Sequence, residues 1–282
     1  ILSSAMPRAG GSYLYASRGL SPYLGFIASF SQWFGLSIVI GVISYIIVPF
    51  IRDVFFNLGF INISDFLEVG SVRLTISLLL IWFFVLINIV GGKVYKNTLI
   101  PMLVIMFVLG SIVLITGLVY DQNDFINSVL NSENRAIEPT SNIKFDWKIF
   151  LTAATLMFSS FIGFDAIAQT GNEAKNPTKN IPRAILLAIF IVASYYILFT
   201  ISVYNIVPWS FVADESITKD ITAPGLLSYV LPQFWGILII IGAAIALIND
   251  LPAMILSVSR LMFAWAKDNI FPNRVALIHS KF

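Results

Sequence analysis

The stretch that decides the fold reads FSSFIGFDA over residues 158–166. It lies in an apolar run of about residues 149–170, which is long enough to cross a membrane as a helix. A carboxylate inside such a helix costs about 2.5–3.5 kcal/mol on insertion scales, so Asp165 is expected to face a cavity or a polar partner. Gly163 loosens a helix, and serine hydroxyls can bond carbonyls that a break sets free. We therefore predict a helix break between Phe161 and Asp165.

Two interpretations of this stretch remain open from the residues alone. In the first, non-helical backbone lines an aqueous cavity, as in secondary transporters whose broken helices present carbonyls to a cation or an amine. In the second, the helix is continuous, Gly163 packs against a neighbouring helix, and Asp165 pairs with an interior polar group. The two interpretations differ in whether the helical hydrogen-bond ladder runs unbroken through this stretch.

The rest of the chain has the composition of a membrane protein. Of its 282 residues, 58% are hydrophobic and 11% are charged, whereas about a quarter of the residues of a soluble domain are charged. Backbone polar groups cannot stay unpaired in lipid, so the long apolar runs must be helices. We predict an all-α, polytopic bundle forming a single membrane domain over 1–282. Its six predicted spans cover about 22–48, 73–91, 98–119, 149–170, 184–206 and 234–258.

Loop charges predict the orientation of these spans. The N-terminal region, the 92–97 turn, the 171–183 loop and the C-terminal tail hold 11 of the 17 basic residues and two of the 15 acids. By the positive-inside rule both ends of the chain are cytoplasmic, in a multi-pass protein that we assign to the plasma membrane. Two segments, 7–20 and Leu261–Ile270, are expected to lie along the cytoplasmic interface, with Trp265 at headgroup depth.

A second carboxylate, Asp250, falls inside the sixth span and is followed by Pro252. Two intramembrane acids without an intramembrane base suit a cation, a proton or an ammonium group better than an anion. Burial raises a carboxyl pKa, so Asp250 could also bind a proton near neutral pH. The alternative is that Asp250 satisfies backbone groups disturbed by Pro252. With no cysteine and a single histidine, the chain offers no thiolate or histidine metal site and no Ser/His constellation, so we predict no cofactor and no enzyme activity.

Three groups of residues, in this order along the chain, resemble motifs of the amino acid–polyamine–organocation (APC) superfamily. The first is PRAGGSY (7–13) followed by SPYLGF (21–26), which resembles a loop and the start of the third helix. The second is FIGFD (161–165) with Glu173, KNP (175–177) and IPRAI (181–185), which resembles the sixth helix and its following loop. The third runs from SRL (259–261) to KDNIFP (267–272) and resembles the end of the eighth helix.

The resemblance implies a LeuT-like inverted-repeat transporter fold with one discontinuous helix. Members have about twelve helices, so the chain is expected to run from the end of helix 2 to just after helix 8. It would then lack helix 1, whose glycine-rich segment holds the substrate carboxylate in the family, together with the last helices. Met106 aligns with a position where some proton-coupled members carry lysine, which puts lysine-mediated coupling in doubt.

The resemblance also implies a binding site. The carbonyls around Ser159 and Ile162 would receive the substrate amine, Phe161 would cover it, and Gly163 would permit the break beside Asp165. Four apolar residues would line the side-chain pocket: Leu36, Ile40, Ile43 and Met254. At helical spacing, such residues equally suit plain core or a lipid-facing surface.

The predicted function is therefore a secondary active amino acid transporter, coupled to protons or to Na⁺ through Asp250. Its partners would be an amino acid, the coupling ion and the lipid bilayer. The apolar pocket positions favour a neutral, apolar amino acid over arginine or a polyamine. Alternatives are a polyamine or organic amine exchanger of the same fold, an ion-conducting subunit of a membrane enzyme complex, and a structural or channel-like protein. Basic and acidic residues nearly cancel at a net charge of +2, so no nucleic-acid partner is expected.

Overall fold

The computed structural model describes residues 2–6, 10–90, 92–137, 145–161, 163, 166–169, 174–217 and 222–277, and these ranges contain helices and no strand. The helices are α1 (Leu2–Ala5), α2 (Gly11–Gly19), α3 (Pro22–Asn57), α4 (Ile61–Glu68), α5 (Gly70–Val90), α6 (Gly92–Val119), α7 (Gln122–Glu133), α8 (Trp147–Met157), the 3-10 turn η1 (Phe158–Phe161), α9 (Ala166–Gln169), α10 (Pro177–Ile206), α11 (Trp209–Glu215), α12 (Ala223–Leu227), α13 (Gln233–Lys267) and the 3-10 turn η3 (Asn273–Ala276).

Five of the described helices are long and apolar enough to cross a membrane: α3, α5, α6, α10 and α13. They contain nearly all of the predicted spans 22–48, 73–91, 98–119, 184–206 and 234–258, which confirms an all-α, polytopic membrane fold. The remaining predicted span, 149–170, is divided among α8, η1 and α9. Its crossing of the membrane, and hence the total of six spans, stays a prediction.

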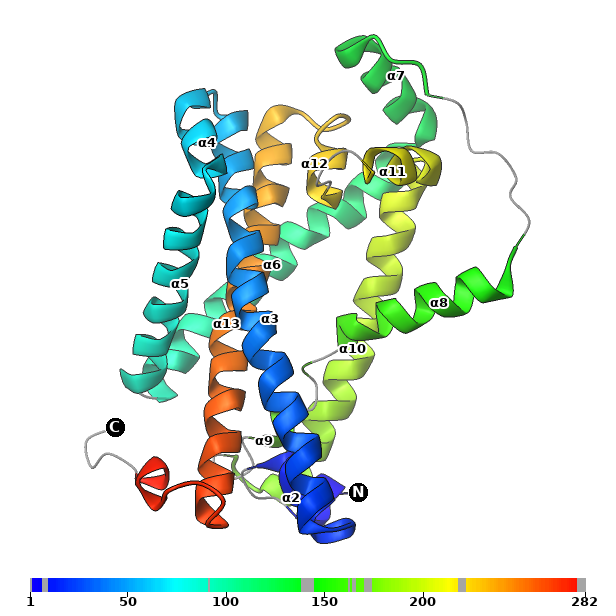
Figure 1. Cartoon of the computed structure of the whole chain (residues 1–282). Coiled ribbons are helices and arrows are strands. Elements are labelled where there is room, and N and C mark those ends of the chain that lie inside the picture. Colours follow the sequence, from blue (N-terminus) through cyan, green and yellow to red (C-terminus); the bar gives the residue numbers. More distant parts are fainter. Residues whose placement is uncertain are drawn as a thin grey trace.

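The centre of the bundle is the pair α3 and α13, which run in opposite directions past each other (Figure 1). Ile40 and Ile47 of α3 pack with Leu251 of α13 and with Phe84 of α5 in one buried apolar cluster. Lipid tails are as apolar as these side chains, so close packing rather than escape from water holds such helices together. The two long helices therefore form a scaffold on which the other spans rest.

Small residues set how closely the helices approach. A Cβ added to Gly25 would lie 2.6 Å from the backbone of Ser17, so α2 packs directly on the first turn of α3. A Cβ on Gly117 would lie 2.5 Å from the Cα of Ser202, which brings α6 and α10 into the same kind of contact. Small residues at helix crossings are typical of membrane bundles, because they let dispersion contacts form between backbones.

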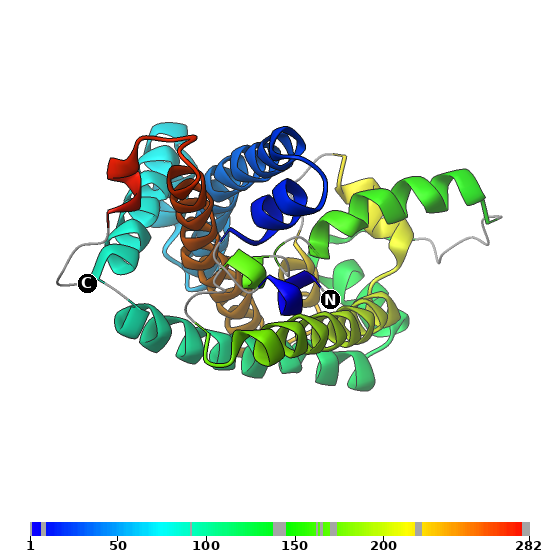
Figure 2. The same cartoon turned by 90° about the horizontal axis from the view of Figure 1, so that it is seen from below.

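The two ends of the bundle differ in their short helices. Figure 1 shows α2, α9 and the C-terminal end of α13 at one end, and α4, α7, α11 and α12 at the other. Seen from the first end, α2 and α9 lie beside α3, α10 and α13 (Figure 2). The first end carries the segments that the sequence assigns to the cytoplasm.

One interfacial segment differs from its prediction. Leu261 to Lys267 do not form a separate element lying along the membrane surface, because they continue α13. Trp265 has 0% of its surface exposed, and its Nε1 donates a hydrogen bond to Ser29 Oγ at 2.9 Å. Trp265 therefore faces the protein interior and not the lipid, while its depth in the membrane stays a prediction. The N–H of a buried indole needs a hydrogen-bond partner, and the Ser29 hydroxyl provides it.

Candidate functional site

The break predicted in residues 158–166 is present in the structure. Helix α8 ends at Met157, the 3-10 turn η1 occupies Phe158–Phe161, and helix resumes at Ala166. Between them Gly163 has a φ of +123°, a conformation that side-chain-bearing residues rarely adopt. This confirms the first interpretation of the stretch in so far as the helix is discontinuous. Ile162, Asp165 and the side chain of Ser159 lie outside what the structure describes.

The two halves of the broken segment lie in different surroundings. Helix α8 has no buried residue and projects away from the bundle (Figures 1 and 2). Helix α9 is embedded among α2, α10 and α13, and its Ala168 and Gln169 are 6% and 0% exposed. The break thus separates a half that the bundle holds tightly from a half that it barely touches.

Tyr196, in the middle of α10, holds the end of the first half. Its hydroxyl donates a hydrogen bond to the Ser160 carbonyl oxygen at 2.9 Å. Its ring meets the Phe161 ring edge-on, with centroids 5.4 Å apart. A carbonyl released from a helical ladder in lipid needs another donor, and Tyr196 supplies it. Sequence reasoning missed Tyr196; the available signal was a tyrosine pair, at 195 and 196, within an otherwise apolar span.

Gln169 holds the second half. Its Nε2 donates to Ser12 Oγ of α2 at 3.0 Å and to Gln32 Oε1 of α3 at 3.2 Å. Ser12 also donates a hydrogen bond to Gln32 Oε1. A fully buried amide is costly unless it is bonded, so this group fixes α9 against α2 and α3. Sequence reasoning missed this contact as well, because its three members are far apart along the chain.

The four predicted pocket residues are placed as follows. Leu36 and Ile40 are 5% and 8% exposed on α3. Ile43 of α3 and Met254 of α13 pack against the same apolar cluster that contains Ile40 and Leu251. Three of the four thus meet in the contact between α3 and α13, where they serve as core. Their role in binding a substrate stays a prediction.

Asp250 projects from α13 with an exposed side chain, within electrostatic range of the Tyr196 hydroxyl. No hydrogen bond or ion pair joins its carboxylate to any other described residue. The hydrogen bond to the backbone at Pro252 comes from α5 instead. Asn88 Nδ2 donates to the Pro252 carbonyl oxygen at 3.3 Å and to the Phe84 carbonyl oxygen at 2.9 Å. The structural alternative for Asp250, that it satisfies backbone near Pro252, finds no such bond among the described residues.

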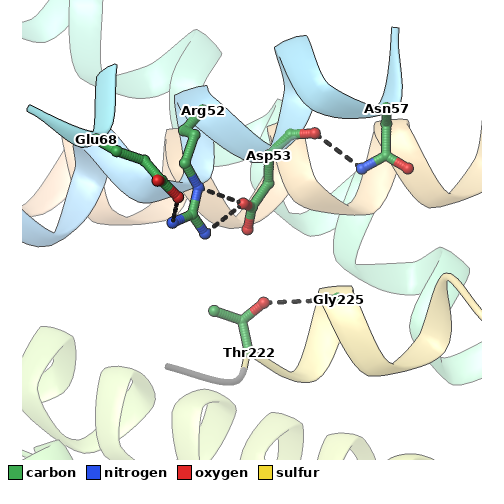
Figure 3. A network of polar contacts seen from close by, with 6 residues as sticks. All are labelled: Arg52, Asp53, Asn57, Glu68, Thr222 and Gly225. Carbon is green, nitrogen blue, oxygen red and sulfur yellow. Dashed lines mark hydrogen bonds and ion pairs between the residues drawn. The ribbon is translucent and has the colours of Figure 1, made fainter. Parts of the chain in front are cut away.

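A cavity of about 740 Å³ lies between α3, α6, α10 and α13, beneath α12. Most of its lining is apolar, and Met106 of α6 belongs to it. Its charged lining residues are Arg52, Asp53 and Arg73, at the end of the bundle that carries α4 and α12. Figure 3 shows Arg52 bonded to Asp53 and to Glu68, with Thr222 of the segment leading into α12 on the opposite side. None of the four predicted pocket residues is among those that line it.

In the described part of the chain, no three His, Asp or Glu side chains gather as a metal site would need.

A bundle of long apolar helices with one discontinuous segment, a tyrosine on its freed carbonyl and a large internal cavity defines a multi-pass α-helical membrane protein of the transporter class. A sequence model of the amino acid permease family matches residues 1–282. The chain belongs to this family, which agrees with the resemblance to the APC superfamily.

Several relatives align with about half of the chain. A chloroplastic cationic amino acid transporter 9 of Arabidopsis thaliana is 31% identical over 134 residues, which are 47% of this chain and 22% of that protein. A branched-chain amino acid permease of Bacillus subtilis is 29% identical over 133 residues, 46% of this chain and 27% of the permease. A human cationic amino acid transporter 4 is 30% identical over 125 residues, 44% of this chain and 19% of that protein. The match thus covers less than a third of the length of each relative.

Proposed function

We propose that this protein is a secondary active transporter that moves amino acids across the plasma membrane, coupled to protons or to another cation. The observation that carries the proposal is the discontinuous segment at 157–166, with Gly163 at positive φ and Tyr196 on the Ser160 carbonyl. Backbone freed from a helix in lipid is tolerated where it lines a cavity, and its carbonyls can accept hydrogen bonds from an ammonium group. Membership of the amino acid permease family supports the same conclusion.

In this proposal the substrate amine meets the carbonyls around Ser159 and Ile162, and Phe161 covers the bound molecule. Tyr196 is positioned to hold the Phe161 ring and the Ser160 carbonyl in place while the site is occupied. Asp165 would add negative charge beside the break. The alternative from another class is an ion-conducting subunit, which would need a chain of intramembrane bases and acids. The interiors of the predicted spans contain two acids, Asp165 and Asp250, and no base.

The substrate that we favour is a neutral, apolar amino acid. Leu36, Ile40, Ile43 and Met254 supply an apolar surface, and a relative from Bacillus subtilis is named as a branched-chain amino acid permease. The second candidate is a cationic amino acid, because other relatives are named as cationic amino acid transporters. A polyamine or organic amine exchanger is the remaining alternative of the same fold.

The experiment uses the complete protein reconstituted in proteoliposomes. Uptake of labelled leucine driven by an inward proton or Na⁺ gradient, with competition by alanine, arginine and spermidine, identifies the substrate class. We expect leucine and alanine to compete and arginine and spermidine not to. Competition by arginine alone would transfer the assignment to cationic amino acids, and no uptake of any amino acid would refute the proposal.

We assign the coupling role to Asp250. Its carboxylate has no hydrogen bond or ion pair to a described residue, so it is available to bind a cation or a proton. Asp250→Asn is expected to abolish accumulation against a gradient while exchange of internal for external substrate persists. Asp65→Asn, at an exposed acid on α4, is the matched control. Normal accumulation by Asp250→Asn, or loss of exchange in protein that is still folded, would exclude this role.

Six crossings with both ends in the cytoplasm complete the proposal. The excess of basic residues in the loops assigned to the inside supports it. A reporter fused after Phe282, a position outside the described residues, is expected to be cytoplasmic. A reporter signal from the other side of the membrane would reverse the orientation.

A further inference from the structure

Two arginines line the cavity, and the structure treats them differently. Arg52 is fully engaged: its Nε and Nη2 donate to Asp53 Oδ1 at 2.9 and 2.6 Å, and its Nη1 donates to Glu68 Oε1 at 3.0 Å (Figure 3). Arg73, in the first turn of α5, has no carboxylate within ion-pair distance among the described residues. Both arginines look alike in the sequence, since each lies near the end of an apolar span.

Arg73 is nevertheless held in a defined position. Its Nε donates a hydrogen bond to the Tyr45 carbonyl oxygen of α3 at 3.0 Å, and its guanidinium carbon lies 3.8 Å from the centre of the Tyr45 ring. Stacking of this kind stabilises a guanidinium without neutralising its charge. The hydrogen bond occupies one of five N–H donors, and no described residue accepts a hydrogen bond from the Nη edge, which presents a planar fork to another partner. The side chain is therefore oriented in advance for an anion that the described residues do not supply.

The space next to this fork is apolar. The cavity of about 740 Å³ has walls that include Phe107 of α6, Phe199 of α10 and Leu247 of α13. This volume is in the range of small-molecule sites, which combine apolar walls with a few placed polar groups. One free guanidinium beside an apolar volume suits a ligand with a carboxylate at one end and an apolar body, because a guanidinium binds a carboxylate through two parallel hydrogen bonds.

We propose that Arg73 binds the carboxylate of an apolar amino acid whose side chain occupies this cavity. The site is separate from the helix break, since neither Ser160 nor Phe161 lines the cavity. It lies at the end of the bundle that carries α4 and α12, which is the outer end in the proposed orientation. The amino acid is thus held there before it reaches the break. This inference rests on the proposed transport function and adds a second position for the same substrate.

The first test needs only the unmodified complete protein in proteoliposomes. Leucine uptake is measured in competition with 4-methylpentanoate, which keeps the carboxylate and lacks the amine, and with 3-methylbutylamine, which keeps the amine and lacks the carboxylate. We expect 4-methylpentanoate to inhibit leucine uptake although it lacks the amine required at the break. If 4-methylpentanoate does not inhibit, no carboxylate site of this kind exists and the inference is overturned.

The second test assigns the effect to Arg73. Arg73→Gln is expected to raise the concentration of 4-methylpentanoate needed for half inhibition about 10- to 150-fold, because a charge-assisted pair is worth about 1.5–3 kcal/mol. Arg73→Lys keeps the charge, loses the fork and is expected to lie in between. Lys148→Gln, which removes an exposed cation of α8 away from the cavity, is the matched control. Unchanged inhibition in Arg73→Gln would overturn the assignment.

Two further outcomes are distinguishable. If the unmodified protein takes up no amino acid, the proposed function fails. If the unmodified protein takes up leucine and 4-methylpentanoate inhibits the Arg73 variants as strongly as the wild type, this inference fails and the proposed function stands. The same fork could hold the phosphate of a lipid headgroup, so the variants are also compared in liposomes with and without phosphatidylglycerol. A change in lipid dependence without a change in 4-methylpentanoate inhibition would show that Arg73 binds lipid and would overturn the amino acid site.

Discussion

The scaffold helix α13 and the broken segment α8–η1–α9 are both apolar and each carries one acid within its predicted span, yet α13 is continuous and the other segment is not. Helix α13 continues for 35 residues through Pro252, with twelve buried residues distributed from Gly236 to Ala266. Helix α8 stops after 11 residues and has none. A proline inside a helix removes one hydrogen bond and displaces a carbonyl. Packing on both sides of α13 compensates for that loss, and the break has no comparable packing on its α8 side.

This difference indicates that packing against neighbouring helices, more than the helix propensity of the local residues, decides whether a membrane helix is continuous. Around Pro252, Asn88 of α5 reaches the backbone and Leu251 is fully enclosed. Around Gly163, a Cβ would meet nothing within 4 Å, and η1 is joined to α10 by the Tyr196 hydrogen bond to Ser160 and by the contact of the Phe161 and Tyr196 rings. Changes in the scaffold should therefore alter stability, whereas changes at the break should alter transport.

The largest effect is expected from Leu251→Ala in the scaffold. Leu251 is 0% exposed between α3, α5 and α13, so the shortened side chain leaves a cavity that rigid helices cannot close. Losses for such substitutions are about 2–5 kcal/mol. Thermal unfolding in detergent measures the change, and Leu186→Ala, on the exposed face of α10, is the control. Equal stability of the two variants would contradict the division into scaffold and break.

Tyr13 provides a second test of the scaffold, at the end of α13. Its hydroxyl donates to Asp268 Oδ2 at 2.7 Å, a bond to a charged group worth about 1.5–3 kcal/mol. Burial first, and then Asp268, raises the pKa of Tyr13 to about 12. The folded pKa exceeds the unfolded value near 10, so the contribution is complete below pH 10 and is lost as the pH rises to 12.

Tyr13→Phe should therefore be less stable than wild type below pH 10 and lose less stability between pH 10 and 12. Unfolding followed at a series of pH values measures this, with Tyr23→Phe, an exposed tyrosine on α3, as the control. A parallel pH dependence in wild type and Tyr13→Phe would show that this hydroxyl does not contribute as described.

Gly163→Ala tests the break. At a φ of +123° an alanine is strained by about 1–3 kcal/mol, although no neighbouring atom opposes its Cβ. Because α8 is not buried, we expect little change in the unfolding temperature and a marked loss of uptake. Gly35→Ala, inside α3 and also without a neighbour within 4 Å, is the control; it should leave uptake unchanged and raise stability slightly, because alanine is the better helix former. Normal uptake by Gly163→Ala would mean that this conformation is not required for transport.

The smallest effect is expected from Tyr196→Phe, which removes the hydroxyl and keeps the ring against Phe161. Losing a neutral hydrogen bond to Ser160 costs about 0.5–1.5 kcal/mol. If this bond stabilises the conformation that transports, uptake should decrease about 2- to 12-fold. Tyr204→Phe, at an exposed tyrosine of α10 that does not line the cavity of about 740 Å³ and whose hydroxyl has no hydrogen bond to a described residue, serves as the comparison. Equal uptake by the two variants would remove Tyr196 from the site.

The sequence by itself determined the helical class, the position of the long spans and the existence of the break. These follow from local physics: an apolar run of some 20 residues must pair its own backbone in lipid, and a glycine with serines in mid-span permits a break. The same information predicts the apolar character of Ile40, Ile43 and Met254 without deciding between a pocket and a core, because hydrophobicity records burial and not the neighbour that causes it. The structure places these three side chains in a core.

Only the tertiary structure decided which polar groups pair with one another. Tyr196 lies 36 residues from Ser160, and Gln169 lies 157 residues from Ser12, so no local pattern could pair them. It enclosed Trp265 within the protein, where Ser29 of another helix accepts its N–H. It also separated Arg52, which pairs with two acids, from Arg73, which pairs with no acid among the described residues. A charge near the end of a span has the same sequence signature whether or not a partner exists, since partners are brought together only when the helices pack.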